Sequence, residues 1–338
     1  MTKKQRLDAF HKLGDYLRSD DRELRQVIEL AYRNNPWFTI ENTRRSVEAI
    51  ALYLSMDELQ NWLAPYPFDT DTDKTVGLVL AGNIPLVGFH DILCVLASGF
   101  NVQVKTAAVD PALTPHLLAK LQEIEPGFTR KIQVTDRLAN FDLVIATGSD
   151  NSSRYFNHYF GHKPHIIRKN RNSVAILSGT ENAEELRRLG TDIFDYFGLG
   201  CRSVSKLFIP VDYDPSIFFE GIAAFGDVIN HHKYANNYDY NKSIYLINGD
   251  QHYDNGFLLL KPDERSASPL AALYLETYPS TEKLLTRLNE LAPQLQCVVS
   301  KEPLLVTTPV VRFGESQQPA LDDYADGVNT LDFLAAHR

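Results

Sequence analysis

The feature that most constrains the fold is an alternation of short apolar runs with amphipathic segments between residues 76 and 146. The runs at 76–81, 102–105, 131–135 and 141–146 are typical of buried strands. The segments between them predict helices at 87–97 and 111–123. Because strands that alternate with helices form a parallel sheet with helices on its faces, this region predicts an α/β domain.

A second, smaller α/β unit is expected from residue 173. Its strands are predicted at 174–177, 205–210, 243–247 and 256–260, and its helices at 182–197, 215–229 and 281–291. Amphipathic helices are predicted at 4–33 and 43–64, and an acidic turn with a short helix at 321–337. The predicted domains are 1–172, 173–300 and a C-terminal segment 301–338, for which a return to the first domain is one option.

Composition excludes several classes of function. The net charge of −9 disfavours nucleic-acid binding, because contact with phosphates needs a basic surface. No stretch approaches the roughly 20 apolar residues of a membrane span, and no apolar region of a secretory signal follows the first lysines. Three cysteines without a pairing pattern indicate a reducing compartment. We therefore expect a cytoplasmic protein.

Polar turns follow three of the predicted strands. Gly82 and Asn83 lie in the turn after the first strand, where backbone N–H groups and an amide would face a ligand at the carboxyl edge of the sheet. The turn is not GxGxxG, and taken alone it is better explained as a structural Gly-Asn turn with Pro85 at the first helical position. Lys105 ends another strand, either in a ligand crevice or in solvent. Thr147-Gly148-Ser149 ends a strand and feeds a helix expected at 152–160, which suits an anion.

Cys201 differs in its surroundings from the other two cysteines. It follows two glycines in Gly198-Leu-Gly-Cys-Arg202, a turn that lets the backbone approach a ligand closely. Arg202 and Lys206 nearby would favour a thiolate that attacks a carbonyl. Cys94 and Cys297 stand in apolar runs and are expected to be buried thiols. The histidines show no metal-ligand spacing, and neither a GxSxG motif nor a GxxxxGK[ST] loop occurs.

The order of these motifs resembles the aldehyde dehydrogenase superfamily, and within it the LuxC-type acyl-CoA reductase family. The similar stretches lie between residues 76 and 328. They are Ala81-Gly-Asn-Ile-Pro, Ile166-Ile-Arg-Lys-Asn-Arg-Asn-Ser-Val-Ala, Gly198-Leu-Gly-Cys-Arg-Ser-Val and Asp322-Asp-Tyr-Ala-Asp-Gly-Val. The resemblance implies a Rossmann-type cofactor domain and a smaller α/β catalytic domain.

The resemblance also implies roles for individual residues. Cys201 would be the nucleophile and Asn83 the oxyanion-hole amide. The residues implied along the cofactor are Lys105 at the adenine ribose together with Gly82, Thr147, Gly148 and Ser149. Many NAD-preferring relatives carry a glutamate three residues after that lysine, whereas this chain has Ala108. The cofactor is therefore expected to be NADPH, with NADH as the alternative.

One departure from the family pattern sharpens the expected reaction. Hydrolytic aldehyde dehydrogenases carry a general-base glutamate where this chain has Arg168, and reduction of a thioester needs no activated water. The resemblance thus implies reduction of a long-chain fatty acyl-CoA to an aldehyde through an acyl-cysteine. The basic residues Arg168, Arg171 and Arg202 would meet the CoA phosphates, or form a solvated patch.

Other readings stay open. The acyl donor could instead be an acyl phosphate or an acyl-carrier protein, and the chain could be a non-catalytic nucleotide-binding protein of the same fold. The sequence leaves open an acyl-transfer partner or a homo-oligomer. Between residues 69 and 76 there is little room for the β-hairpin arm that usually builds dimers in the superfamily.

Overall fold

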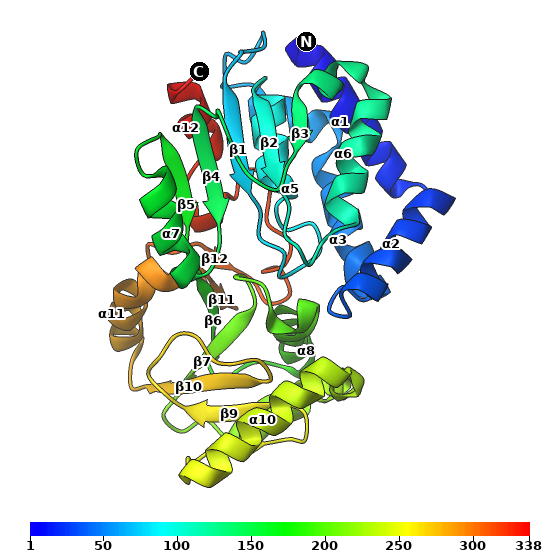
Figure 1. Cartoon of the computed structure of the whole chain (residues 1–338). Coiled ribbons are helices and arrows are strands. Elements are labelled where there is room, and N and C mark those ends of the chain that lie inside the picture. Colours follow the sequence, from blue (N-terminus) through cyan, green and yellow to red (C-terminus); the bar gives the residue numbers. More distant parts are fainter. The chain divides into compact units, whose positions relative to one another are not determined.

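The computed structural model describes residues 1–338, with residue 150 described by its backbone alone, and the chain divides into two compact units (Figure 1). The first unit comprises Met1–Asn170 and Ala320–Arg338, and the second comprises Arg171–Pro319. The expected C-terminal segment 301–338 is thus divided: residues up to 319 belong to the second unit, and the last nineteen return to the first. The chain therefore passes between the units twice.

The first unit contains a parallel sheet of five strands, which confirms the predicted α/β class. The strands are β1 (Thr75–Val79), β2 (Asn101–Lys105), β3 (Ile132–Val134), β4 (Leu143–Thr147) and β5 (His165–Arg168), in the order β3-β2-β1-β4-β5. From β1 the chain proceeds outward to β2 and β3, then returns to the other side of β1 for β4 and β5. This reversal places a topological switch point between β1 and β4, where open α/β sheets bind ligands. The sequence prediction missed β5, because its four residues include two polar ones, His165 and Arg168.

Helices surround this sheet. They are α1 (Lys3–Arg18), α2 (Arg22–Asn34), α3 (Ile40–Tyr53), α4 (Met56–Leu63), α5 (Phe89–Ala97), α6 (Leu113–Ile124), α7 (Asp150–Phe160) and α12 (Thr330–Ala336), with 3-10 turns η1 (Pro126–Arg130) and η5 (Ala325–Gly327). Both long helices predicted before the sheet are wrong in extent, since each is two helices. Asp21 ends the continuity of the first by capping α2, and Ser55 does the same for α4.

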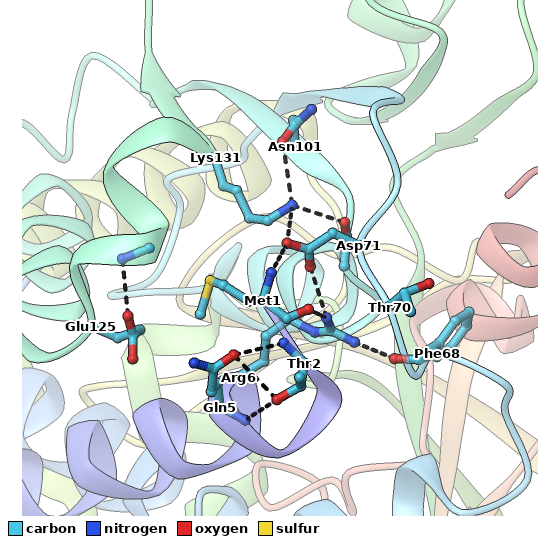
Figure 2. A network of polar contacts seen from close by, with 12 residues as sticks. Met1, Thr2, Gln5, Arg6, Phe68, Thr70, Asp71, Asn101, Glu125 and Lys131 are labelled. Atoms are coloured by element: carbon cyan, nitrogen blue, oxygen red, sulfur yellow. Dashed lines mark hydrogen bonds and ion pairs between the residues drawn. The ribbon is translucent and has the colours of Figure 1, made fainter.

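A buried arginine fastens α1 to the sheet region (Figure 2). Arg6 is fully buried, and its guanidinium donates to the carbonyl of Ala97 at 3.0 Å and to the Asp71 carboxylate at 2.8 Å. Lys131 pairs with Asp71 at 3.1 Å and the N-terminal ammonium of Met1 pairs with it too, so one carboxylate serves three cations. Because buried charges are tolerated only when paired, this network fixes α1 in one position.

The second unit contains a seven-stranded sheet. Its strands are β6 (Asn172–Ile176), β7 (Val204–Pro210), β8 (Tyr253–Asp254), β9 (Leu259–Pro262), β10 (Ala272–Tyr278), β11 (Leu295–Ser300) and β12 (Val310–Val311). The order is β12-β11-β6-β7-β10-β9-β8, and all neighbours are parallel except β8 and β9. The helices are α8 (Ala183–Phe194), α9 (Pro215–Gly221), α10 (His232–Asn248) and α11 (Thr281–Leu291), with 3-10 turns η2 (Asp195–Gly198), η3 (Ala223–Asn230) and η4 (Ala292–Gln294).

The strand predicted at 243–247 is wrong, because these residues form the last turns of α10. Gly249 ends the helix in the left-handed conformation with φ 69°. Of the apolar side chains in this run, Tyr245 is buried, whereas Leu246 and Ile247 are 63% and 80% exposed. A short apolar run does not distinguish a strand from the end of a helix, and here the run continues a long helix.

None of the helices in the described part of the chain is both long enough and apolar enough to cross a membrane.

Candidate functional site

Asn83 lies in the loop between β1 and α5, and that loop is held at several points. The N–H of Leu80 donates to the carbonyl of Lys105 at 3.1 Å, and the hydroxyl of Ser46 on α3 donates to the carbonyl of Pro85 at 2.8 Å. Leu86 adopts the left-handed conformation with φ 57°, which is strained for a residue with a Cβ. Pro85 is not at the first helical position, since Gly88 is the N-cap of α5. The loop presents Asn83 with an exposed side chain.

Gly82 brings this loop against the segment that follows β2. A Cβ on Gly82 would lie 2.4 Å from the Cβ of Ala107 and 2.7 Å from Cγ2 of Val109, so only glycine fits without displacement. Lys105, the last residue of β2, is exposed and is paired in the sheet with Val79, the last residue of β1. The ammonium group and the Gly82 backbone therefore share one edge of the sheet.

The third turn, Thr147-Gly148-Ser149, lies across the switch point at the same edge, because β4 is the other neighbour of β1. A Cβ on Gly148 would lie 2.8 Å from the ring of Phe156 and 2.9 Å from Cβ of Ser152, so the turn closes tightly on α7. Ser149 caps α7 by accepting from the N–H of Ser152 at 3.3 Å. A helix N-terminus favours an anion. This edge offers a cation, hydroxyls and a helix N-terminus, which suit a dinucleotide.

Cys201 lies in a turn of the second unit that is reached through strained backbone. Tyr196, Phe197 and Gly198 are three consecutive residues in the left-handed region, with φ 53°, 59° and 77°. This conformation costs roughly 1–2 kcal/mol for each residue that carries a Cβ. The ring of Phe197 contacts the imidazole of His231, with centroids 4.3 Å apart. Strain that packing maintains in this way is found at functional sites.

Hydrogen bonds to two polar side chains define the turn itself. The N–H of Gly200 donates to the hydroxyl of Ser203 at 3.2 Å, and the N–H of Ser203 donates to the carbonyl of Gly200 at 3.0 Å. The amide of Gln317 also donates to the Ser203 hydroxyl, at 3.3 Å. Cys201 is held half-buried, three residues before β7 begins. Ser203 is not among the site residues expected from the sequence, although its place two residues after the cysteine is a usable signal.

Cys94 and Cys297 are both fully buried, which confirms the expectation for these two thiols. Burial is the first cause of the raised pKa of Cys297, which is about 11. Cys94 likewise has a pKa well above the ordinary value because of burial. Neither thiol is suited to act as a nucleophile, since the reactive species is the thiolate.

Arg168 is not available to CoA. Its side chain is buried, forms an ion pair with Asp91 on α5 and donates to the hydroxyl of Thr330 at 3.0 Å. Burial alone lowers the pKa of Arg168, but attraction to Asp91 and the hydrogen bond between them raise it above its ordinary value. The guanidinium is therefore permanently charged and already paired, and the expected contact with CoA phosphates is wrong for this residue.

The other basic residues differ from one another. Lys206 is fully buried, is paired with Glu276 and donates to the carbonyl of Asp263 at 3.0 Å, so the expectation that it favours a Cys201 thiolate is wrong. Arg171 is half-buried and donates to the carbonyl of Leu295 at 3.0 Å. Arg202 is half-buried beside Cys201, and its charge offsets part of the burial effect on the pKa of Cys297.

In the part of the chain whose side chains are described, no three histidine, cysteine or acidic residues converge in a way that could hold a metal ion.

No protein-family model matches the sequence, and no curated protein sequence matches it either. Solved structures do. Aldehyde dehydrogenase 21 from Physcomitrella patens, in complex with the reaction product succinate, superposes with a TM-score of 0.73 at 14% identity, over 100% of this chain and 84% of that one. The fold is that of the aldehyde dehydrogenases.

Other aldehyde dehydrogenases superpose to a similar extent. The enzyme from Bacillus cereus in complex with NAD+ has a TM-score of 0.72 at 13% identity, over 98% of this chain and 82% of that one. Apo betaine aldehyde dehydrogenase from Staphylococcus aureus has a TM-score of 0.68 at 13% identity, over 89% and 72%. At these identities the likeness establishes the aldehyde dehydrogenase-like fold, with a Rossmann-type sheet and a second sheet. The reaction has to be inferred from the residues of the site.

Proposed function

We propose that this chain reduces a long-chain fatty acyl-CoA thioester to the aldehyde, with NADPH as reductant and with an acyl-cysteine on Cys201 as intermediate. The observation that carries the proposal is a pair of features in one fold. Cys201 is presented half-buried in a strained, hydrogen-bonded turn, and Arg168, at about the place of the hydrolytic base, is buried in an ion pair. The acyl group would thus be held without activated water.

The cofactor would be held at the carboxyl edge of the first sheet. Lys105 would contact the adenine ribose, while the backbones of Gly82 and Gly148 and the hydroxyls of Thr147 and Ser149 would line the phosphates. An added Cβ at either position would collide with neighbouring side chains, so both turns need glycine to take up their places at the edge where the cofactor would lie. When bound, NADPH would supply the hydride. Ala108 in place of an acidic residue leaves no carboxylate to repel a 2′-phosphate, and this favours NADPH over NADH.

Cys201 would open the reaction through its sulfur. The Sγ–C bond forms at the thioester carbonyl, the bond from that carbon to the CoA sulfur breaks, and CoA leaves as its thiol. The side-chain amide of Asn83 and the N–H of Cys201 would donate to the developing oxyanion. Each such donor typically contributes about 2.7–4 kcal/mol to the transition state. Arg202 and Arg171 remain the candidates for contact with CoA phosphates.

Arg168 supports reduction over hydrolysis through its protonation state. A general base must accept a proton from water, and a guanidinium whose pKa is raised by Asp91 stays protonated. The acyl-enzyme would therefore persist until hydride reaches the carbonyl carbon, and the aldehyde leaves when the C–S bond to Cys201 breaks.

The test is NADPH oxidation by wild type and by Cys201→Ala, with aldehyde trapped, against long-chain acyl-CoA. We expect the variant to lose activity and Cys94→Ala to keep it, since the thiol of Cys94 is fully buried. Equal rates for wild type and Cys201→Ala would overturn the nucleophile assignment. Acyl phosphate and acyl-carrier protein in parallel assays identify the physiological donor. Absence of activity with all donors, together with no selective iodoacetamide labelling of Cys201, would favour a non-catalytic nucleotide-binding protein.

A further inference from the structure

Ser173 lies directly between the nucleophile's backbone and the buried thiol of Cys297. Its hydroxyl donates to the carbonyl oxygen of Cys201 at 3.0 Å and lies 3.1 Å from Sγ of Cys297. The sheet order explains this arrangement, because β6, which carries Ser173, lies between β7, which follows Cys201, and β11, which carries Cys297. Ser173 and Cys297 are both fully buried.

The direction of these hydrogen bonds follows from the donor inventory. A serine hydroxyl has one hydrogen, and here it is given to the Cys201 carbonyl, so the Ser173 oxygen can only accept from Cys297. Burial keeps the pKa of Cys297 near 11, and its sulfur therefore carries a hydrogen at neutral pH. The three groups form a chain from the Cys297 S–H to the Ser173 O–H to the Cys201 carbonyl.

We propose that Ser173 is a positioning residue for the Cys201 turn, oriented by the Cys297 thiol beneath it. Fixing the carbonyl of Cys201 fixes the peptide plane between Cys201 and Arg202, and with it the ψ angle of the nucleophile. A buried hydrogen bond is stronger than a solvated one because the local dielectric is low. Ser203 and Gln317 hold the turn on its Gly200 side, and Ser173 holds it on the carbonyl side of Cys201.

The positioning role can be measured without any substrate. In amide hydrogen exchange, peptides covering residues 196–204 should exchange about five- to tenfold faster in Ser173→Ala than in wild type, the effect of one lost hydrogen bond. The matched control is Ser266→Ala, another buried serine of the same unit, whose hydroxyl bonds Gln294 at 2.9 Å. That control should leave the 196–204 peptides at the wild-type rate.

The effect on catalysis rests on the proposed function and is measured separately. Ser173→Ala should lower kcat for acyl-CoA reduction about five- to tenfold, with the KM values for acyl-CoA and NADPH within twofold. Cys297→Ala should lower kcat about twofold, because a thiol is a weak donor, and Cys297→Ser should restore the wild-type value. If Ser173→Ala does not fold, Cys297→Ala and Cys297→Ser test the same hydrogen-bond chain.

The outcomes separate the two proposals. Faster exchange in the turn of Ser173→Ala supports the positioning role even if wild type reduces no acyl donor, in which case only the proposed function fails. Wild-type exchange rates in folded Ser173→Ala, or wild-type rates in Cys297→Ala if only that variant folds, would overturn the role. Faster exchange with unchanged kcat would also overturn it, since the contact would then serve the fold alone.

Discussion

Asp91 and Arg168 form a buried ion pair at the point where α5 begins and β5 ends. Arg168 stands two residues before the chain leaves the first unit, and His90, beside Asp91, lies with Nε2 2.8 Å from the carbonyl of Leu321, just after the chain returns. Two neighbouring residues of α5 thus hold both connections on the first unit. The same helix follows the loop that carries Asn83, the candidate oxyanion donor.

Removing one partner of this ion pair should be costly. Asp91→Ala leaves the Arg168 guanidinium buried without its carboxylate, and the free energy of unfolding should fall by about 3–5 kcal/mol. Denaturant unfolding followed by circular dichroism measures the change. The double variant Asp91→Leu with Arg168→Met removes both charges and should recover most of the loss. A single variant as stable as wild type would contradict the assignment of a tightly coupled pair.

Asn83→Ala should lower kcat for thioester reduction about 10²–10³-fold, the usual effect of losing one oxyanion donor. Because the Asn83 side chain is exposed, the melting temperature should change by little. Steady-state kinetics and a thermal melt on the same preparation test both statements. Full activity in a folded Asn83→Ala would exclude this residue from the oxyanion hole.

Gly198, next to the Cys201 turn, can be compared with Gly249, which caps the end of α10, because both adopt the left-handed conformation. Gly198 and Gly249 both have positive φ, 77° and 69°, and an added Cβ would meet no atom closer than the Ile193 carbonyl oxygen at 3.5 Å for Gly198 and none within 4 Å for Gly249. Alanine at either position should cost about 1–2 kcal/mol of stability through backbone strain alone. Only Gly198→Ala should also lower the acylation rate of Cys201. An equal loss of activity in Gly249→Ala would show that the effect is not local.

The pKa of Asp192 predicts how stability depends on pH. Burial raises this pKa to about 6, although the N–H groups of Gly314 and Ser316 donate to the carboxylate at 2.6 and 2.9 Å. Since the native state binds the proton more tightly than the unfolded chain, the contribution is fully present below about pH 4 and is lost as pH rises through 6. A shift of this size corresponds to about 3 kcal/mol.

Unfolding free energies of wild type and Asp192→Asn between pH 4 and 7 test this. The difference between wild type and variant should decline as pH rises, because asparagine does not titrate. A difference that stays constant across this range would mean that Asp192 has an ordinary pKa in the folded protein.

Cofactor preference should follow the residue at position 108. Ala108→Glu places a carboxylate where it would repel a 2′-phosphate and accept from a 2′-hydroxyl, so KM for NADPH should rise at least about tenfold while KM for NADH stays within about twofold. The measurement is the ratio of kcat/KM for the two cofactors. Ala108→Gln is the uncharged control, and an equal shift in that variant would make the effect steric rather than electrostatic.

The sequence by itself determined the features that depend on local chemistry. Apolar runs such as Val76–Val79 and Leu143–Ala146 identified central strands, because buried parallel strands need continuous apolar side chains. The glycines around Cys201 distinguished it from Cys94 and Cys297, since only flexible backbone presents a thiol in a turn.

Tertiary structure alone decided the features that depend on partners distant in sequence. Arg168 could have met solvent, CoA or a carboxylate, and only the packing of α5 against the sheet brought Asp91 to it. The sequence contains no pattern that marks Ser173 as part of the site. Its partners Cys201 and Cys297 are 28 and 124 residues away, and only the order of the strands brings them next to it. The apolar run at 243–247 predicted a strand, but in the fold these residues form the end of the helix that runs to Asn248. Local sequence determines what a residue can bind, and the fold determines which partner lies within reach.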